Sequence, residues 1–557
     1  MGIRRSYAER ARSFRAEPAG SASGRPLRFR SPHPSPYPTR MSTHTPETVH
    51  MEPLNIHTEP HTFQNYIGGH WQDAASGETF EDRNPARQSD LIGHFPKSGK
   101  ADVDAAVQAA KDAFDAWRLT PAPERGDYLR RVGDLMTVYK DELAHAMTRE
   151  MGKPHFETKG DVQEAIDTAY YAATEGRRLF GHTVPSELRN KFNMSVRRPI
   201  GVCGLISAWN FPVAVPTWKM FPALVSGNTV VFKPSEDAPH SGMLLVQILE
   251  MAGFPKGVVN IVQGAGEVGQ AIIEHPDVAA VSFTGSTETG SKIGAVCGRL
   301  HKRFSAEMGG KNPSIVMEDA DLDLALEGLV WGAFGTTGQR CTATSRLIVH
   351  EDVHDELVGM LKERAESLTL GYGNDEGTEM GPLINKKALD KVSSYMEVAK
   401  EDGVTILTGG ARATGDGLDD GFFFQPTIFT GVEQGMRVEQ EEIFGPVLSV
   451  IKIKSFDEAI EVANGVIYGL SSAVYTRDVA RAFRALRDLD AGITYVNGPT
   501  IGAEAHMPFG GVKGTGNGHR EGGWEVFDFY TETKTCYVDY SGTLQRAQID
   551  NYVEDVP

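Results

Sequence analysis

The chain has 557 residues, of which 40% are hydrophobic and 23% charged, with 60 Gly, 4 Cys and a formal net charge of -18. This length predicts two or three domains, each able to bury a core, and it excludes a small disulfide scaffold. The composition is that of a globular protein. The overall acidity argues against nucleic acid as the main partner, because phosphate binding needs clustered Lys and Arg.

The N-terminal segment differs from the rest of the chain. Residues 1–40 contain nine Arg and two Glu and have a net charge of +7, which leaves -25 for the remainder. An Arg- and Ser-rich start is typical of an organellar transit peptide, but its six prolines fit poorly with an amphipathic helix. The other interpretations are a disordered tail and translated upstream sequence with the true start at Met41 or Met51. We predict that residues 1–61 form a disordered N-terminal extension.

The elements that follow indicate an α/β protein. Apolar residues recur at helical spacing over 102–117 and over 129–147, which predicts amphipathic helices. Further on, short runs rich in β-branched residues alternate with helical stretches, a pattern typical of parallel βαβ units. The predicted strands are 229–232, 258–262, 278–283, 346–350 and 448–453, and the predicted helices between and around them are 241–251, 266–274, 322–331, 353–368 and 479–489.

One uncharged stretch, 199–218, is long enough to cross a bilayer. Its internal Pro212 and Pro216 argue against a single helix, so we predict a buried strand that ends in a loop and no membrane partner. Asn210 would then lie at the end of that strand, a common place for chemistry in α/β folds. Four well-separated cysteines with no pairing pattern predict a reducing, cytoplasmic location.

Two glycine-containing turns are candidates for phosphate binding. Gly264, Gly266 and Gly269 form a G-x-G-x-x-G pattern after a predicted strand, but the acidic residue expected about 20 residues later is absent. These glycines are therefore either a phosphate cradle or tight-turn positions. The next unit runs from strand 278–283 into Gly285 and Ser286 at a helix start, which favours phosphate binding or a simple N-cap by Ser286.

The segment 335–346, GTTGQRCTATSR, contains the most informative cysteine. Cys341 has small and polar neighbours and Arg340 beside it, which is not the environment of a core cysteine, and a thiol is the strongest protein nucleophile. The other three cysteines lie in apolar or helical contexts. Upstream, Glu307 precedes a Gly pair, where a carboxylate could move into and out of a site.

From about Tyr66 to Tyr540 the chain resembles the NAD(P)-dependent aldehyde dehydrogenase superfamily, through AWNFP, VFKPSE, FTGST, EMGGKNP, GQRC, EEIFGP and PFGGVKGTG in that order. The resemblance implies a Rossmann-type NAD domain, an α/β catalytic domain and a β arm that joins subunits into a dimer or tetramer. The expected ranges are 62–181 and 200–309 for the NAD domain, 310–526 for the catalytic domain, and 182–199 and 527–545 for the arm.

The same resemblance assigns roles to single residues. Cys341 would attack the aldehyde carbon, Asn210 would stabilise the oxyanion, and Glu307 would be the base that hydrolyses the resulting thioester. The cofactor would be NAD, with NADP as the alternative, and no metal is expected. The residues expected to contact the cofactor are Lys233, Glu236, Gly285, Ser286, Glu442 and Phe444.

The anchor loop at 495–511 looks like that of antiquitin-like and 2-oxoglutarate semialdehyde dehydrogenases. With Arg340 it indicates a short semialdehyde that carries an acid group, read by Arg340 and Glu504. In the alternative interpretation Arg340 pairs with an internal carboxylate and Glu504 only shapes the loop. Two other functions stay open: a CoA-acylating semialdehyde dehydrogenase, and a non-catalytic protein that retains the fold.

Overall fold

The computed structural model describes residues 53–550. Of the predicted N-terminal extension, 1–52 lie outside the described residues. Leu54 is nonetheless buried in a hydrophobic cluster, and the backbone N–H of Asn55 donates to Oε1 of Gln247 at 3.0 Å. The packed chain therefore begins before residue 62, where the sequence placed the domain boundary.

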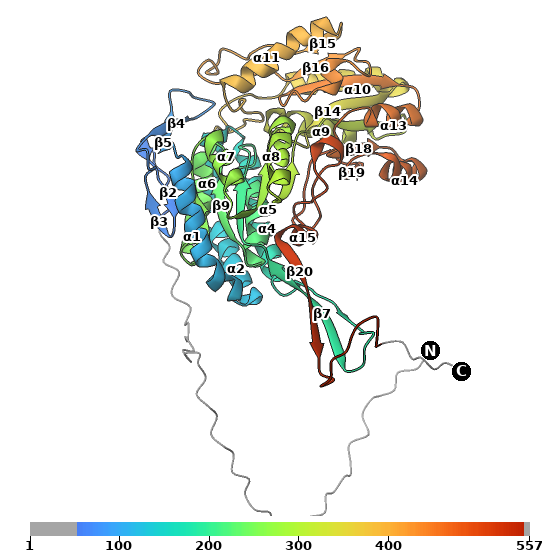
Figure 1. The fold of residues 1–557 in the computed structure, drawn as a ribbon. Helices are drawn as coiled ribbons and strands as arrows, with labels where there is room; N and C mark the ends of the chain where they lie inside the picture. Colours follow the sequence, from blue (N-terminus) through green and yellow to red (C-terminus); the bar gives the residue numbers. More distant parts are fainter. Residues whose placement is uncertain (1–52, 551–557) are drawn as a thin grey trace, which may run out of the picture. The chain divides into compact units, whose positions relative to one another are not determined.

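The first half of the chain forms a seven-stranded sheet, shown in blue to green in Figure 1. The strand order is β12-β11-β8-β9-β10-β2-β3, parallel except for the antiparallel strands β2 and β3 at one edge. The strands are β2 (Asn65–Ile67), β3 (His70–Gln72), β8 (Val202–Ile206), β9 (Thr229–Lys233), β10 (Val259–Ile261), β11 (Val278–Thr284) and β12 (Arg303–Glu307).

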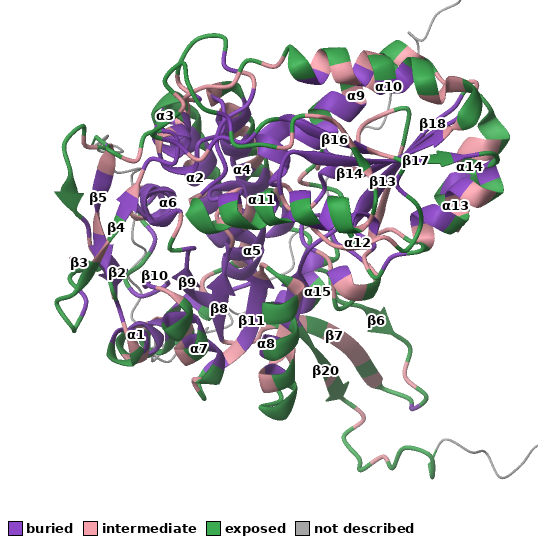
Figure 2. Cartoon of the chain, turned by 90° about the horizontal axis from the view of Figure 1, so that it is seen from above, coloured by how far each residue is buried: buried purple, intermediate pink, exposed green. Residues whose placement is uncertain are grey.

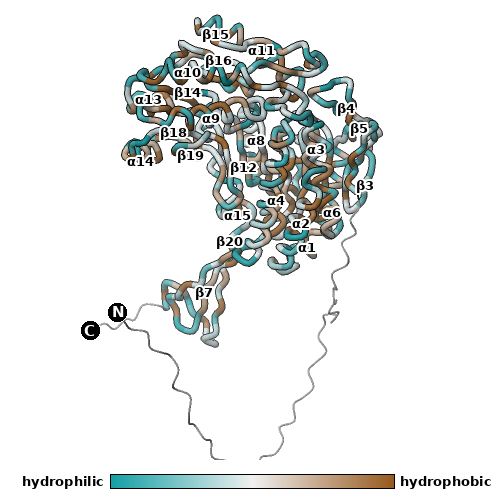
Figure 3. Tube along the Cα trace, turned by 180° about the vertical axis from the view of Figure 1, so that it is seen from behind, coloured by the Kyte–Doolittle hydropathy of each residue, from teal (hydrophilic) through white to brown (hydrophobic). Residues whose placement is uncertain are grey.

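Helices cover both faces of this sheet, so every residue of β9 is buried. Val230 and Phe232 belong to one hydrophobic cluster, and Val231, which points the other way, belongs to another. In Figure 3 hydrophobic residues are concentrated in the region where α2, α4 and α6 lie together. The helices are α1 (Lys100–Leu119), α2 (Ala122–Val138), α3 (Lys140–Met151), α4 (His155–Glu175), α5 (Ala214–Val225), α6 (Pro239–Met251), α7 (Gly266–Glu274) and α8 (Thr287–Arg299).

A second seven-stranded sheet follows, in the order β15-β16-β17-β14-β13-β18-β19, with β15 alone antiparallel. Its strands are β13 (Asn312–Val316), β14 (Thr344–His350), β15 (Thr405–Thr408), β16 (Thr427–Thr430), β17 (Val447–Ile453), β18 (Ser471–Tyr475) and β19 (Ile493–Val496). Its helices are α9 (Leu322–Phe334), α10 (Glu351–Glu366), α11 (Lys386–Glu401), α12 (Arg437–Gln440), α13 (Phe456–Asn464) and α14 (Val479–Asp488), with short 3₁₀ turns η1 (Gly335–Gly338) and η2 (Lys513–Thr515).

Two smaller sheets complete the structure. β1 (His61–Thr62), β5 (Leu91–Pro96) and β4 (Thr79–Arg83) pack beside the first sheet, and β20 (Thr531–Asp539), β7 (Lys191–Pro199) and β6 (Thr183–Val184) form an antiparallel arm. Figures 1 and 2 show this arm projecting from the body with largely exposed residues. α15 (Val526–Tyr530) lies just before β20. Unlike the arm, it is buried in the hydrophobic cluster that includes residues of the first sheet.

Two sequence predictions need correction. The helix expected over 129–147 is two helices, because Tyr139 leaves helical geometry (φ -93°, ψ 17°) and lies at the end of α2 and the start of α3. The stretch 199–218 is a strand and a loop as expected, but its C-terminal part is the start of α5, where Pro216 occupies the first turn and leaves no helical hydrogen bond unmade. In the part of the chain that the structure describes, no helix is long and apolar enough to cross a membrane.

Candidate active site

Cys341 and Glu307 come together in a small chamber between the two large sheets. Glu307 ends β12 in the first sheet, and Cys341 lies in the loop that leads into β14 of the second. The chamber has a volume of about 100 Å³, and its walls include Trp218, Phe509 and Thr284 beside these two residues. The sequence separated the thiol and the carboxylate by 34 positions, and the packing of the two sheets brings them to one cavity.

Glu307 is buried, and neither of its carboxylate oxygens has a hydrogen-bond partner among the described residues. Burial raises the pKa of Glu307 well above its ordinary value, and the nearby Glu521 raises it further, while Lys219, Arg520 and the backbone N–H of Gly511 act in the opposite direction. Glu521 forms a buried ion pair with Lys219. These surroundings favour the neutral form of Glu307 and make its ionised form a stronger base than an ordinary carboxylate.

Burial raises the pKa of the Cys341 thiol to about 12, and the carboxylates of Glu307 and Glu442 contribute to that shift. The thiol is thus protonated near neutral pH and needs a base to become a nucleophile. Asn312 holds the loop in place, because its Nδ2 donates to the carbonyl oxygens of Cys341 and Ala343, each at 2.8 Å. The sequence contained Asn312 in EMGGKNP but gave it no role.

The predicted oxyanion residue, Asn210, follows β8 and is 5% exposed. Its Nδ2 donates to the carbonyl oxygen of Gln339 at 3.0 Å, two residues before the thiol. The structure therefore places Asn210 against the Cys341 loop, although it is not among the residues that line the chamber.

Glu157, on α4, was missed by the sequence reasoning and organises the residues before the thiol. It accepts hydrogen bonds from the backbone N–H of Thr336 at 2.9 Å and from the Thr336 hydroxyl, and its Oε2 lies 2.6 Å from Nη2 of Arg340. Thr336 has a φ of 52°, which is unusual for a β-branched residue. Glu157 thus fixes a strained turn and the Arg340 side chain together.

Arg340 consequently has an internal partner, as the alternative interpretation expected. Its Nε also donates to Oγ1 of Thr336 at 2.8 Å, and its guanidinium lies 4.6 Å from the ring centre of Trp331. Among the described residues no hydrogen bond from Nη1 was found, and the side chain lines an outer cavity. The Arg340 side chain is therefore held in place by Glu157, Thr336 and Trp331, while its Nη1 can still donate to a ligand.

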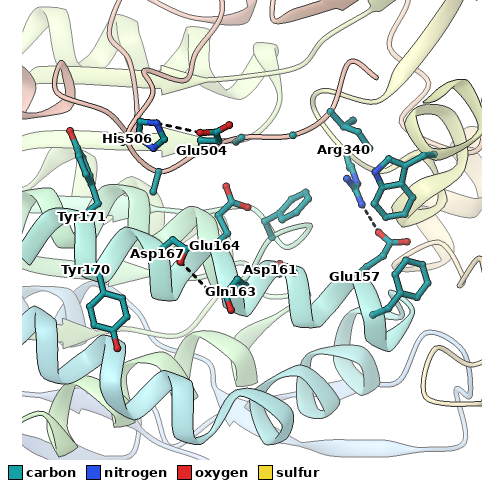
Figure 4. A pocket seen from close by; sticks show the side chains of 18 residues that line it. Glu157, Asp161, Gln163, Glu164, Asp167, Tyr170, Tyr171, Arg340, Glu504 and His506 are labelled. Carbon is teal, nitrogen blue, oxygen red and sulfur yellow. Dashed lines mark hydrogen bonds and ion pairs between the residues drawn. The ribbon is translucent and has the colours of Figure 1, made fainter. Parts of the chain in front are cut away.

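This outer cavity has a volume of about 820 Å³ and is shown in Figure 4. Glu504, predicted to contact substrate, lies at its rim, where its side chain is 72% exposed and 3.3 Å from Nε2 of His506. Glu164 points into the cavity from α4. Five residues line both the outer cavity and the chamber around Cys341: Glu164, Phe211, Arg340, Gly502 and Ala503.

A separate cleft of about 530 Å³ lies along the carboxyl ends of strands β8, β9 and β11 of the first sheet. Four of the predicted cofactor residues line it: Lys233, Glu236, Gly285 and Ser286. Ser286 caps α8 by accepting from the Thr289 N–H at 3.3 Å, and the start of that helix faces the cleft. Strand ends and a helix N-terminus are where α/β folds bind dinucleotides.

The polar groups of the cleft fit a nucleotide. Lys233 Nζ lies 3.0 Å from Oε2 of Glu236, and although burial acts to raise the pKa of Glu236, Lys233 and hydrogen bonds lower it overall. Glu236 is therefore ionised and able to accept from ribose hydroxyls. Ser207 Oγ and Thr284 Oγ1, which also line the cleft, are buried without a hydrogen-bond partner among the described residues.

The three glycines of the G-x-G-x-x-G pattern do not all have the same role: one is a tight-turn position and two line the cleft. Gly264 has a φ of +140°, which only glycine adopts readily, so it is a tight-turn position. Gly266 and Gly269 do line the cleft. The sequence reasoning did not identify Trp209 or Lys292, which line it as well.

Glu442 and Phe444 lie outside the walls of this cleft but close to it. The Phe444 ring packs edge-on against Trp209, with 5.7 Å between ring centres. Oε1 of Glu442 accepts from the Gly310 N–H at 2.9 Å, and a Cβ on Gly309 would lie 2.5 Å from its Oε2, so a side chain there would displace the carboxylate. The Gly pair after Glu307 thus accommodates the Glu442 carboxylate.

Two α/β sheets enclose a partly buried thiol and a buried carboxylate, with a cleft along the strand ends beside them, which is the arrangement of a dinucleotide-dependent oxidoreductase. The chain belongs to the aldehyde dehydrogenase family, whose model matches residues 71–536. It is therefore an aldehyde-oxidising enzyme, as the motifs predicted.

The chain is similar to proteins named alpha-ketoglutaric semialdehyde dehydrogenase in Bacillus subtilis, at 41% identity over 87% of this chain and 100% of the relative, and alpha-ketoglutarate semialdehyde dehydrogenase in Haloferax volcanii, at 43% over 86% and 99%. The fold is similar to betaine aldehyde dehydrogenase from Staphylococcus aureus in complex with NAD+, with a TM-score of 0.84 and 36% identity over 86% of this chain and 95% of that one.

Proposed function

We propose that the protein oxidises a short aldehyde with a carboxylate group to the corresponding acid, using NAD and water rather than CoA. The observation that carries this proposal is the chamber in which Cys341 and Glu307 lie together, reached from the cavity that Glu164 and Arg340 line. Both relatives named above are named for semialdehydes that contain carboxylates.

In this proposal the ionised form of Glu307 takes the proton of the Cys341 thiol, and the sulfur bonds to the aldehyde carbon to give a thiohemiacetal. Asn210 and the backbone N–H of Cys341 stabilise the oxygen, which becomes negative as that bond forms. After oxidation the carbon is a thioester. After Glu307 has released the thiol proton to solvent, it removes a proton from water and the hydroxide oxygen adds to the thioester carbon. The carbon–sulfur bond then breaks, and the leaving thiolate takes the proton from Glu307 to give the free acid and the thiol.

Bound NAD would supply the hydride acceptor for the oxidation. Lys233, Glu236, Gly285 and Ser286 would hold its adenosine and phosphate groups, and Glu442 and Phe444 its nicotinamide end. We propose NAD over NADP, because the ionised Glu236 would repel a 2′-phosphate and its Lys233 partner offsets that charge only in part. Glu236→Gln should narrow the difference in KM between NAD and NADP.

The terminal nitrogen of Arg340 that has no internal partner would bind the substrate carboxylate. Arg340→Leu should raise KM for an acidic semialdehyde about tenfold more than for a neutral aldehyde of the same length, the loss expected for one ion pair. An equal rise for both substrates would mean that Arg340 acts only through its contact with Glu157.

The experiment that tests the whole proposal is an assay of a panel of semialdehydes with NAD and with NADP, each in the absence and presence of CoA. NAD reduction without CoA supports hydrolysis through Glu307. Turnover that requires CoA would favour the CoA-acylating alternative, and no turnover with any aldehyde would favour a non-catalytic role.

We also propose that the arm formed by β6, β7 and β20 joins subunits into a homodimer or homotetramer, because its exposed strands include Phe192, Tyr537 and Val538. Deleting 531–545 and measuring the mass in solution tests this. All four cysteines are free, which supports the predicted cytoplasmic location. Localisation of the tagged native protein would test that second point.

A further inference from the structure

The outer cavity and the Cys341 chamber share part of their walls, and we call this shared part the neck. It is formed by the five residues shared by both cavities, and Gly502 and Ala503 contribute almost no side chain on one side. Of the five, only Glu164 and Arg340 are ionisable. Any aldehyde that reaches Cys341 with a polar tail extending outward must place that tail beside these two groups.

Figure 4 shows the Glu164 side chain pointing into the cavity, with Arg340 on the other side of the space and tied to Glu157. Oε1 of Glu164 is buried and has no hydrogen-bond partner among the described residues. A buried carboxyl oxygen without a hydrogen-bond partner raises the free energy of the empty site. A substrate that forms this hydrogen bond removes that cost and binds more tightly as a result.

We infer that the Glu164 carboxyl, in its protonated form, donates a hydrogen bond to the carboxylate of the bound semialdehyde and thereby selects acidic over neutral aldehydes. This inference rests on the proposed function and adds a second group to Arg340. A neutral carboxyl and a guanidinium on two sides of the neck would satisfy both oxygens of one carboxylate. An ionised Glu164 would repel the same substrate.

The surroundings of Glu164 keep the proton on it. Burial raises the pKa of Glu164 to about 8, Asp161 and Asp167 on the same helix raise it, and Lys153 and Arg340 lower it. The other ionisable residues that line the outer cavity or the chamber behind it are Glu157, Tyr170, Tyr171, Glu504, His506, Glu307, Glu521 and Cys341, and Tyr495 interacts electrostatically with Glu164. Glu164 therefore carries its proton at pH 7 and loses most of it by pH 9.

The test compares two five-carbon substrates, 5-oxopentanoate and pentanal, in the CoA-free assay with saturating NAD from pH 7 to pH 9. The ratio of their kcat/KM values cancels every ionisation that both substrates share, including those of Glu307 and Cys341. For the native enzyme this ratio should fall about tenfold over the range, since roughly one tenth of Glu164 stays protonated one unit above its pKa.

Glu164→Gln keeps a hydrogen-bond donor of the same shape and cannot ionise, so its ratio should stay constant with pH. Glu164→Ala removes the donor and should give a constant ratio near the low value of the native enzyme at pH 9. Asp167→Asn is the matched control. Asp167 is an exposed acid on the same cavity wall and accepts a hydrogen bond from Gln163, so this variant should keep the fall with pH, with its midpoint slightly lower because Asp167 raises the pKa of Glu164.

A ratio that does not change with pH in the native enzyme, or that falls equally in Glu164→Gln, would overturn the role of Glu164. Turnover of pentanal with NAD alone reports separately on the proposed function. If pentanal and 5-oxopentanoate are both inert, the proposed oxidation of short aldehydes is refuted. If pentanal is oxidised and the ratio is flat, only the selection by Glu164 is refuted.

Discussion

Two buried acidic side chains, Glu157 and Glu307, lie near the segment that carries Cys341, and they differ in their hydrogen-bond and ion-pair partners. Glu157 is 6% exposed and has partners in the Thr336 backbone, the Thr336 hydroxyl and the Arg340 guanidinium. Glu307 is 4% exposed and has no hydrogen-bond partner among the described residues. A buried carboxylate with a full set of partners holds structure, whereas one without partners is available for proton transfer.

Removing the thiol should have the largest effect, because both carboxylates matter to catalysis only through it. Cys341→Ala should lower NADH formation by a factor on the order of a thousand or more, while NAD binding, measured by quenching of protein fluorescence, stays near the native value. A variant with near-native turnover would refute the assignment of Cys341 as nucleophile.

Glu307→Gln should remove the base without disturbing the chamber, because Gln has the same shape. Activation of the thiol and hydrolysis of the thioester should then both slow, the hydrolysis by about 10² to 10⁴, so that the first hydride per subunit is released more slowly than in the native enzyme and the steady state is slower still. Stopped-flow absorbance of NADH measures both phases. A steady rate equal to that of the native enzyme would contradict the role in hydrolysis.

The same substitution at Glu157 should act on stability. Glu157→Gln leaves the Arg340 charge buried without its partner and should lower the free energy of unfolding by about 3 kcal/mol or more, seen as a lower urea midpoint. Glu307→Gln is the matched control and should unfold at the native midpoint or above it, because it removes an unpaired acid. Equal losses in both variants would erase the distinction between the two carboxylates.

The smallest expected effect is on the pH profile. Because the pKa of Glu307 is raised, less of it is ionised at a given pH than for an ordinary carboxyl, so the fraction of active base and the steady rate should rise about tenfold per pH unit below that pKa. The sign for stability is opposite: the folded state holds this proton more tightly than the unfolded state, so stability falls as pH rises from about 4.5 through the folded pKa. Glu307→Gln should lose both dependences.

Local patterns identified much of the fold. The runs that became β9 and β11 are β-branched and buried on both faces, which is visible in a few residues of sequence. The break between α2 and α3 at Tyr139 was not visible, because the apolar spacing continues across it. A change of backbone direction that keeps the same buried face leaves no mark in periodicity.

Some residues of the site could likewise be identified from the sequence, and others could not. Cys341 and the cleft residues lie in short motifs that could be recognised along the chain, although their roles stay predictions until they are tested. Glu157 could not be recognised, because its partners Thr336 and Arg340 are 179 and 183 positions away. The free oxygen of Glu164 could not be predicted either, since a missing partner is a property of three-dimensional packing.

Thr284 lines both the nucleotide-shaped cleft and the Cys341 chamber, whereas the outer cavity opens elsewhere. An aldehyde in the outer cavity and a dinucleotide in the cleft would therefore approach Cys341 through separate openings. Neither molecule has to leave before the other arrives, and an acid product can depart while the dinucleotide stays. Inhibition by the acid should consequently compete with the aldehyde and not with the dinucleotide.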